Sequence, residues 1–328
     1  MLIARRRLLK AGLSLPLLSS PAIARGGFAP LDIATPAQQA VYVATAWGGF
    51  IHFSMATFLD IENAPTNEPF STYAPSSGPG FIDQWIATAV AAKWKTLTYV
   101  VKHIDGFCQW PTASTSYNVT NTPWYAANGS PNLASLFATK CRAAGITPEF
   151  YFSVQDAQVA SLSLTTAQTL AYIQLQLTEL LTQNGPIGAI WMDRAEPAFQ
   201  MTGFPWDSID NRYRFIRGLQ SSCLLVNNSK TASNVLAPTT DIAVYELSGN
   251  PVPGNTIPSE VAAPMRVDNN WFWKTGGNTC LDAPTIEATL ATLSTRTAVY
   301  RLNAGPDTTG NIPSNMVSVL TTVGASLP

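Results

Sequence analysis

The stretch Gly188-Ala189-Ile190-Trp191-Met192-Asp193 places four apolar residues directly before an aspartate. A continuous apolar run of this length is typical of a strand buried on both faces. Residues 165–182 before it have a helical pattern, which Asn184-Gly185-Pro186 ends with a strong stop signal. The order helix, turn, strand, acid predicts a parallel α/β fold, whose chemistry lies at the carboxyl ends of the strands. The alternative is that Asp193 only caps the next segment or ends the strand in solvent.

The same alternation continues along the chain. Strands are predicted at residues 47–53, 97–103, 146–153, 188–193, 223–227, 241–246, 263–273 and 298–303. Helices are predicted at residues 34–45, 81–94, 132–144, 165–182, 206–220, 285–293 and from Pro313 onward. Eight strand units in a chain of 328 residues favour an α/β fold of the (β/α)₈ TIM-like barrel type in a single domain. No glycine-rich phosphate motif follows an early strand, which disfavours an open dinucleotide-binding sheet.

Composition limits the classes of partner. Charged residues make up 12% of the chain, the net charge is −1, and no basic stripe follows the first residues. A nucleic acid or an anionic membrane is therefore not the expected partner. The nine tryptophans and ten tyrosines suit a sugar site, but they also suit an apolar core.

Histidines and cysteines are few and scattered. The two histidines do not form a cluster with the cysteines at metal-ligand spacing, so we expect no metal and no other cofactor. Buried free thiols are the default expectation for the four cysteines, although sequence alone leaves their pairing open; they are Cys108, Cys141, Cys223 and Cys280.

Residues 1–24 have the layout of a secretory signal. Arg5-Arg6-Arg7-Leu8-Leu9-Lys10 precedes an apolar run at residues 11–18, and Ala22-Ile23-Ala24 offers a small-residue cleavage site. The basic part resembles a twin-arginine signal. A membrane anchor is the alternative, but the apolar run is too short to span a bilayer. We expect export to the periplasm or beyond, with residues 25–328 as the mature domain and no membrane contact after cleavage.

Four polar residues follow or end predicted strands: His52, His103, Asp193 and Glu246. In a barrel they would all face one mouth. Two carboxylates at one cavity suggest glycoside hydrolysis, with one as nucleophile and the other as general acid, while neutral histidines bind sugar hydroxyls. Singly, each has a structural explanation, as a core histidine or a solvated loop acid.

Six motifs occur in the order found in one enzyme family. They are Phe50-Ile51-His52-Phe53, residues 57–62, Lys102-His103-Ile104-Asp105-Gly106-Phe107-Cys108-Gln109-Trp110-Pro111 with Tyr117-Asn118-Val119, residues 184–193, Trp271-Phe272-Trp273, and Leu302-Asn303-Ala304-Gly305-Pro306 with Gly310-Asn311-Ile312-Pro313. Together they resemble the catalytic domain of the α-L-fucosidases, glycoside hydrolase family 29. The loop at residues 57–62 is similar to that of the subgroup that prefers α-1,3/1,4-linked fucose.

The resemblance implies a retaining exo-glycosidase that removes terminal α-L-fucose from oligosaccharides or glycoconjugates. It makes Asp193 the nucleophile that forms a covalent glycosyl-enzyme intermediate. Glu246 is the first choice for the acid/base and Glu260 the second. The implied sugar-binding residues are His52, Glu62, His103 and Trp271. The C-terminal β-sandwich of many relatives is not expected within this chain.

Four positions depart from the family pattern, and one of them is Ser54, which replaces the usual glycine after His52-Phe53. Ile104 replaces the second histidine of the motif around His103, and Asn63 stands where relatives carry tryptophan. Arg194 replaces the usual glycine after the nucleophile. These changes leave two alternatives open: a related retaining glycosidase for another sugar, or a catalytically decayed barrel that only binds sugar.

Overall fold

The computed structural model describes residues 34–193, 209–228, 240–247, 249–277 and 279–328. They belong to one compact unit, Asp32–Pro328. The expected signal at residues 1–24 and Arg194 lie outside the described residues.

Eight parallel strands form one sheet with the order β5-β4-β3-β2-β1-β8-β7-β6. The bounds are β1 Trp47–Ile51, β2 Thr96–Lys102, β3 Thr147–Ser153, β4 Ala189–Asp193, β5 Leu224–Asn227, β6 Ala243–Glu246, β7 Ser259–Pro264 and β8 Ala298–Asn303. The first strand pairs with the last, because Trp47 lies opposite Tyr300 and Phe50 lies opposite Asn303. The sheet is therefore a nearly closed (β/α)₈ barrel, as predicted.

Asp241 ties β5 to the segment that leads into β6, where no regular ladder is described. Its backbone N–H donates to Leu225 O at 2.8 Å. Its Oδ2 accepts from the Leu225 N–H at 2.7 Å and pairs with Arg217 of α8 (Ile209–Leu219) at 2.6 Å. A carboxylate thus replaces part of a missing strand-to-strand ladder at the seam of the barrel.

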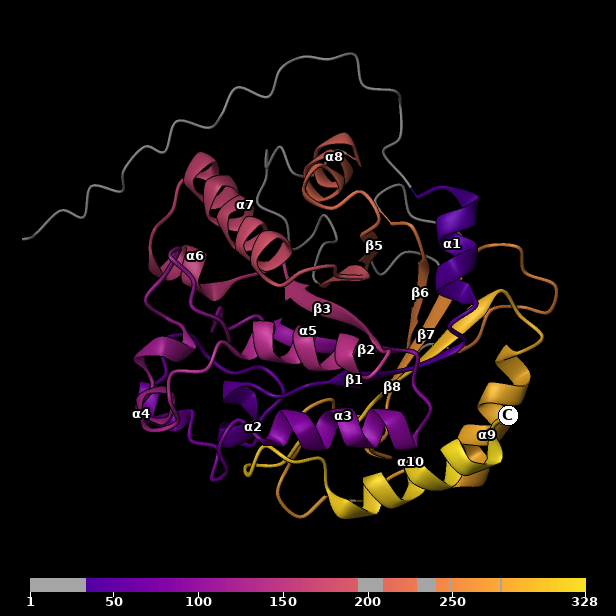
Figure 1. Ribbon diagram of the computed structural model, residues 1–328. Helices are drawn as coiled ribbons and strands as arrows, with labels where there is room; N and C mark the ends of the chain where they lie inside the picture. Colours follow the sequence, from indigo (N-terminus) through magenta and orange to yellow (C-terminus); the bar gives the residue numbers. More distant parts are fainter. Residues whose placement is uncertain (1–33, 194–208, 229–239, 248, 278) are drawn as a thin grey trace, which may run out of the picture. The chain divides into compact units, whose positions relative to one another are not determined.

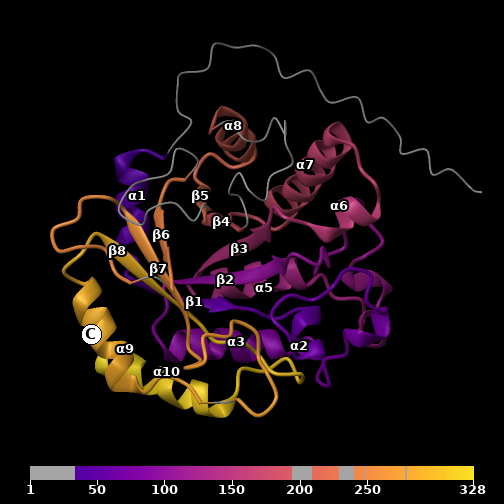
Figure 2. The same cartoon turned by 180° about the vertical axis from the view of Figure 1, so that it is seen from behind.

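Helices lie outside the strands, as Figures 1 and 2 show for α3, α5, α7, α9 and α10. Their starts match the sequence signals: Thr35 forms a capping box before Pro36, and Thr165 forms another with Gln168. The remaining bounds are α1 Pro36–Val43, α2 Met55–Leu59, α3 Phe81–Ala91, α4 Pro123–Ala127, α5 Leu133–Ala143, α6 Ala157–Ser161, α7 Thr166–Gln183, α9 Ala283–Leu293 and α10 Ser314–Ser326, with short 3₁₀ turns at Phe70–Thr72 and Val119–Asn121.

A buried ionic cluster lies among the strands of the barrel. The Arg301 guanidinium lies 3.3 Å from Glu149 and 3.5 Å from Glu260, and all three side chains are shielded from solvent. Tyr42 of α1 donates a hydrogen bond to Glu260. Arg301 has room because residue 48 is glycine: a Cβ there would collide with the guanidinium. The cluster occupies space that apolar side chains usually fill in such barrels.

The prediction of the seventh strand at 263–273 is wrong. The structure has β7 at Ser259–Pro264, and Trp271-Phe272-Trp273 lies in the loop that follows it. The observed strand is short and contains two alanines and a glutamate, so its apolar signal is weak. The aromatic run at residues 271–273 resembles a strand in sequence because aromatic residues favour strands. In the structure it lies in a loop at the mouth of the barrel.

Three of the four cysteines are buried and one, Cys280, is partly exposed; all four are free thiols in the structure. Within the described ranges, no helix combines the length and apolar character that crossing a bilayer requires.

Candidate active site

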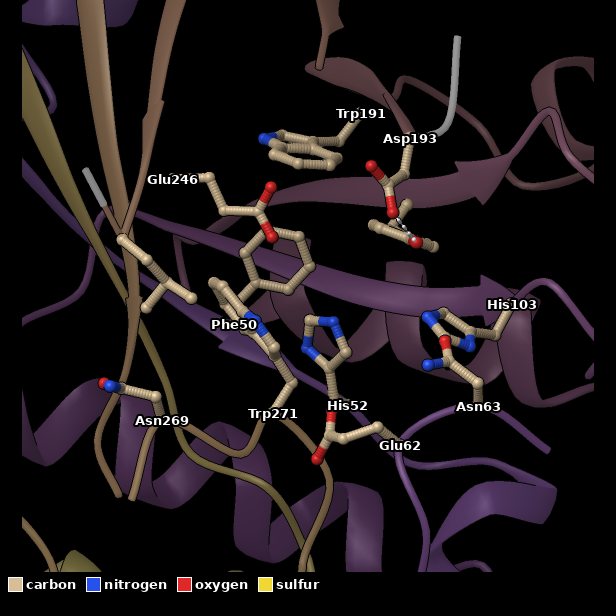
Figure 3. A pocket seen from close by; sticks show the side chains of 12 residues that line it. Phe50, His52, Glu62, Asn63, His103, Trp191, Asp193, Glu246, Asn269 and Trp271 are labelled. Atoms are coloured by element: carbon tan, nitrogen blue, oxygen red, sulfur yellow. Dashed lines mark hydrogen bonds between the residues drawn. The ribbon is translucent and has the colours of Figure 1, made fainter. Parts of the chain in front are cut away.

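A pocket of about 230 Å³ lies at the carboxyl ends of the strands (Figure 3). It is lined by Phe50, His52, Glu62, Asn63, His103, Tyr151, Trp191, Asp193, Glu246, Leu247, Asn269 and Trp271. The two histidines, two strand-end carboxylates, Glu62 and Trp271 that the sequence singled out therefore meet in one cavity. Its volume is below the roughly 300–1,000 Å³ of drug-sized ligand sites, which suits one small ring.

Asp193 and Glu246 face the same space in the pocket (Figure 3). One amide group joins them. Asn228, directly after β5, donates from Nδ2 to Asp193 Oδ1 at 2.9 Å and to Glu246 Oε2 at 2.6 Å. Because both oxygens accept from the same nitrogen, these two bonds limit their separation to 5.5 Å. This upper limit is compatible with the roughly 5–5.5 Å between the carboxyl groups of retaining glycosidases, and it lies below the roughly 6.5–9.5 Å of inverting ones.

Tyr151 of β3 holds the other oxygen of Asp193. Its hydroxyl donates to Asp193 Oδ2 at 2.6 Å. Its ring stacks on Trp191 with centroids 5.4 Å apart and on His103 with centroids 5.8 Å apart. Asp193 is thus held by a hydrogen bond at each oxygen and is 8% exposed, which leaves it oriented toward the cavity.

Asn303, the last residue of β8, fixes the state of His52. Its Oδ1 accepts from the His52 backbone N–H at 3.1 Å and lies 2.8 Å from His52 Nδ1, while its Nδ2 donates to Trp271 O at 2.7 Å. The amide oxygen can only accept, so Nδ1 carries the proton and Nε2 is left as an acceptor. Burial, then the nearby His103, hold the pKa of His52 well below its ordinary value, so the ring is neutral.

Glu62 and Trp271 come from loops that meet at the rim. Glu62 Oε1 accepts from the Phe272 N–H at 3.2 Å, which ties the loop after β1 to the loop after β7. Partial burial raises the pKa of the Glu62 carboxyl, and the backbone amides of residues 271 and 272 oppose that rise. The Trp271 ring lies 4.9 Å from the His52 ring, centroid to centroid.

Glu260, the second choice for the acid/base, lies away from the pocket lining. It is the second residue of β7, fully buried within the barrel beside Arg301. Its Oε1 accepts from Trp191 Nε1 at 2.8 Å, so it supports a residue of the pocket wall without reaching the cavity. The geometry therefore favours Glu246 for this role.

Three residues that sequence reasoning did not select take part in the site: Tyr151, Asn228 and Asn303. Asn303 stood inside a quoted motif at the end of a strand, and Asn228 directly follows another strand, so the strand-end rule applied to amides would have found both. Tyr151 lies within a predicted strand and carries no such signal. Among the described residues, no group of histidine, cysteine, aspartate and glutamate side chains could hold a metal ion.

A (β/α)₈ barrel with two carboxylates at this spacing and a rim of neutral histidine, tryptophan and amide groups is the arrangement of a glycoside hydrolase. Residues 81–328 match the family model described as alpha-L-fucosidase. The chain therefore belongs to the α-L-fucosidase family.

Known relatives extend beyond the matched region. A relative from Oryza sativa subsp. japonica is 26% identical over 295 residues, which cover 83% of this chain and 54% of that protein. Alpha-L-fucosidase 1 of Arabidopsis thaliana is 31% identical over 147 residues, which cover 45% of this chain and 28% of that one. The chain thus spans about half the length of the rice relative. The structure of alpha-L-fucosidase isoenzyme 1 from Paenibacillus thiaminolyticus shares the fold, with a TM-score of 0.74 at 23% identity, covering 88% of this chain and 74% of that one.

Proposed function

We propose that the protein is a retaining exo-α-L-fucosidase that removes terminal fucose from glycans. The observation that carries the proposal is the shared Asn228 donor, because it places carboxylate oxygens of Asp193 and Glu246 within 5.5 Å of each other. A small pocket with polar residues on its walls suits the last sugar of a chain rather than an internal one.

In the first half of the reaction, an oxygen of Asp193 attacks the anomeric carbon. The bond from that carbon to the leaving oxygen breaks, and Glu246 gives its proton to the leaving oxygen. The product is a covalent glycosyl-enzyme ester and a free alcohol. In the second half, Glu246 takes a proton from water, whose oxygen attacks the same carbon and releases Asp193 as carboxylate. Two inversions give net retention.

The remaining pocket residues bind the sugar. Neutral His52 offers Nε2 as an acceptor for a hydroxyl, with the opposite nitrogen fixed by Asn303. His103 and Glu62 line the same pocket and supply further hydrogen-bonding groups. Trp271 presents an apolar ring to the C–H face of the sugar.

The test is turnover of 4-nitrophenyl glycosides by the purified protein. We expect release from the α-L-fucoside, with α-L-fucose as the first anomer seen by NMR. Activity on other glycosides but not on the fucoside would show that the departures at Asn63 and Ile104 have changed the sugar. Fucose binding without any turnover would show a decayed site, and β-L-fucose as first product would exclude retention.

We also propose export through the twin-arginine route, on the basis of Arg5-Arg6-Arg7-Leu8-Leu9-Lys10 and the apolar run that follows. In a bacterial host, the full chain is expected in the periplasm with its first 24 residues removed. Replacing Arg5, Arg6 and Arg7 together by lysine should retain the chain in the cytoplasm. Equal periplasmic yield of both chains would contradict the twin-arginine assignment.

A further inference from the structure

Asn228 stands between the two carboxylates. Its side chain is buried, at 2% exposure, and its backbone N–H donates to Met192 O at 2.7 Å, one residue before Asp193. The amide nitrogen has two hydrogens, and each of its two acceptors belongs to a different carboxylate, Asp193 or Glu246. The side chain therefore bridges the ends of β4 and β6 from the end of β5.

We propose that Asn228 is a positioning residue that holds Asp193 and Glu246 at the spacing of a retaining enzyme through one shared donor group. The inference rests on the proposed hydrolase function, and it adds that the spacing is imposed by a third strand. Without the bridge, electrostatic repulsion would push two carboxylates this close apart whenever both are ionised.

The chemistry of an amide suits this place. An asparagine donates two hydrogen bonds and carries no charge, so it can serve both acids without forming an ion pair with either. A lysine or arginine would favour the charged form of the acid that has to give a proton. An aspartate would bring a third negative charge and would leave two acceptors facing acceptors.

The bridge is also anchored on the strand side. Residue 228 follows β5 directly. Asn227 before it lies opposite Met192 in the β4–β5 ladder. The bond from the Asn228 backbone N–H to Met192 O, at 2.7 Å, holds residue 228 beside the end of β4. Glu246 ends β6, whose described ladder is with β7, so the amide of Asn228 links its carboxylate to the β4–β5 side of the barrel.

Two variants test the inference, Asn228→Ala and the isosteric Asn228→Asp. In a crystal structure of Asn228→Ala, the nearest oxygens of Asp193 and Glu246 should lie more than 5.5 Å apart, the limit set by the shared donor. With the aryl fucoside, kcat should fall about 10²-fold with little change in KM, because ground-state binding is untouched. Asn228→Asp should lower kcat further, because it brings a third negative charge beside both acids.

Asn121→Ala is the matched control, since this exposed asparagine donates to Ser116 O outside the pocket, and its kcat and KM should equal those of the wild type. Unmoved carboxylates in the crystal, or an unchanged kcat in both variants, would overturn the inference. An inactive wild type would instead refute the proposed function, and the crystallographic spacing would still decide the role of Asn228. If Asn228→Ala does not fold, Asn228→Asp gives the same readouts.

Discussion

The Asp193→Ala variant is expected to lose turnover of the aryl α-L-fucoside by about 10⁴-fold or more in kcat, because it removes the carboxylate proposed to form the covalent intermediate. Its thermal stability should change little, since Asp193 lies at the pocket and its partners Tyr151 and Asn228 can turn to water entering the vacated space. The measurement is steady-state release of nitrophenol together with a melting curve.

The matched control for this variant is Asp83→Ala. Asp83 is an aspartate on the outside of the molecule that pairs with Lys140, and its side chain is 62% exposed. It should keep wild-type kcat, because exposed ion pairs contribute little. Residual activity of Asp193→Ala above about one hundredth of the wild type would mean that another residue attacks the anomeric carbon.

If Glu246 is the acid/base, a small nucleophile such as azide should restore the activity of the Glu246→Ala variant. Glu246→Ala is expected to be slow on the aryl fucoside because its second step lacks a base to activate water. Azide needs no base, so it should restore turnover and yield a fucosyl azide with the anomeric configuration of the substrate. The measurement is kcat with and without azide, together with NMR of the product.

Glu260→Ala is the informative comparison. Removal of this carboxylate leaves the Arg301 guanidinium buried beside Glu149 alone and costs Tyr42 and Trp191 a hydrogen-bond acceptor. Breaking a buried ion pair destabilises by about 3–5 kcal/mol, so the variant should melt early and should not respond to azide. Azide rescue of Glu260→Ala, rather than of Glu246→Ala, would transfer the acid/base role to Glu260.

The fold could be predicted from sequence because the barrel repeats one simple signal. Strands such as residues 188–193 and 223–227 are buried on both faces and therefore appear as nearly continuous apolar runs. Helix caps such as Thr35 and Thr165 mark where the chain turns back. The seventh strand did not show this signal. One of its buried positions is Glu260, a member of the ionic cluster, where an apolar residue would be expected.

Of the site, only the residues at the carboxyl ends of strands could be predicted from the sequence. His52, His103, Asp193 and Glu246 each come at or just after a strand, and parallel strands bring those ends together. The hydrogen bonds between these side chains could not be predicted. The bonds from Asn228 to the two acids require the ends of β4, β5 and β6 to lie at the same level along the barrel axis. The order of strands in the sequence does not give that level.

The pairing of β1 with β8 affects how the protein is made. Residues 47–51 cannot find their second neighbour until residues 298–303 have been synthesised, so β1 and β8 can pair only after the whole barrel has been translated. Until then β1 presents an unpaired edge, which is a template for joining another chain. An unfinished or truncated product should thus be prone to aggregate, and a holdase that covers this edge during synthesis would raise the yield of the finished protein.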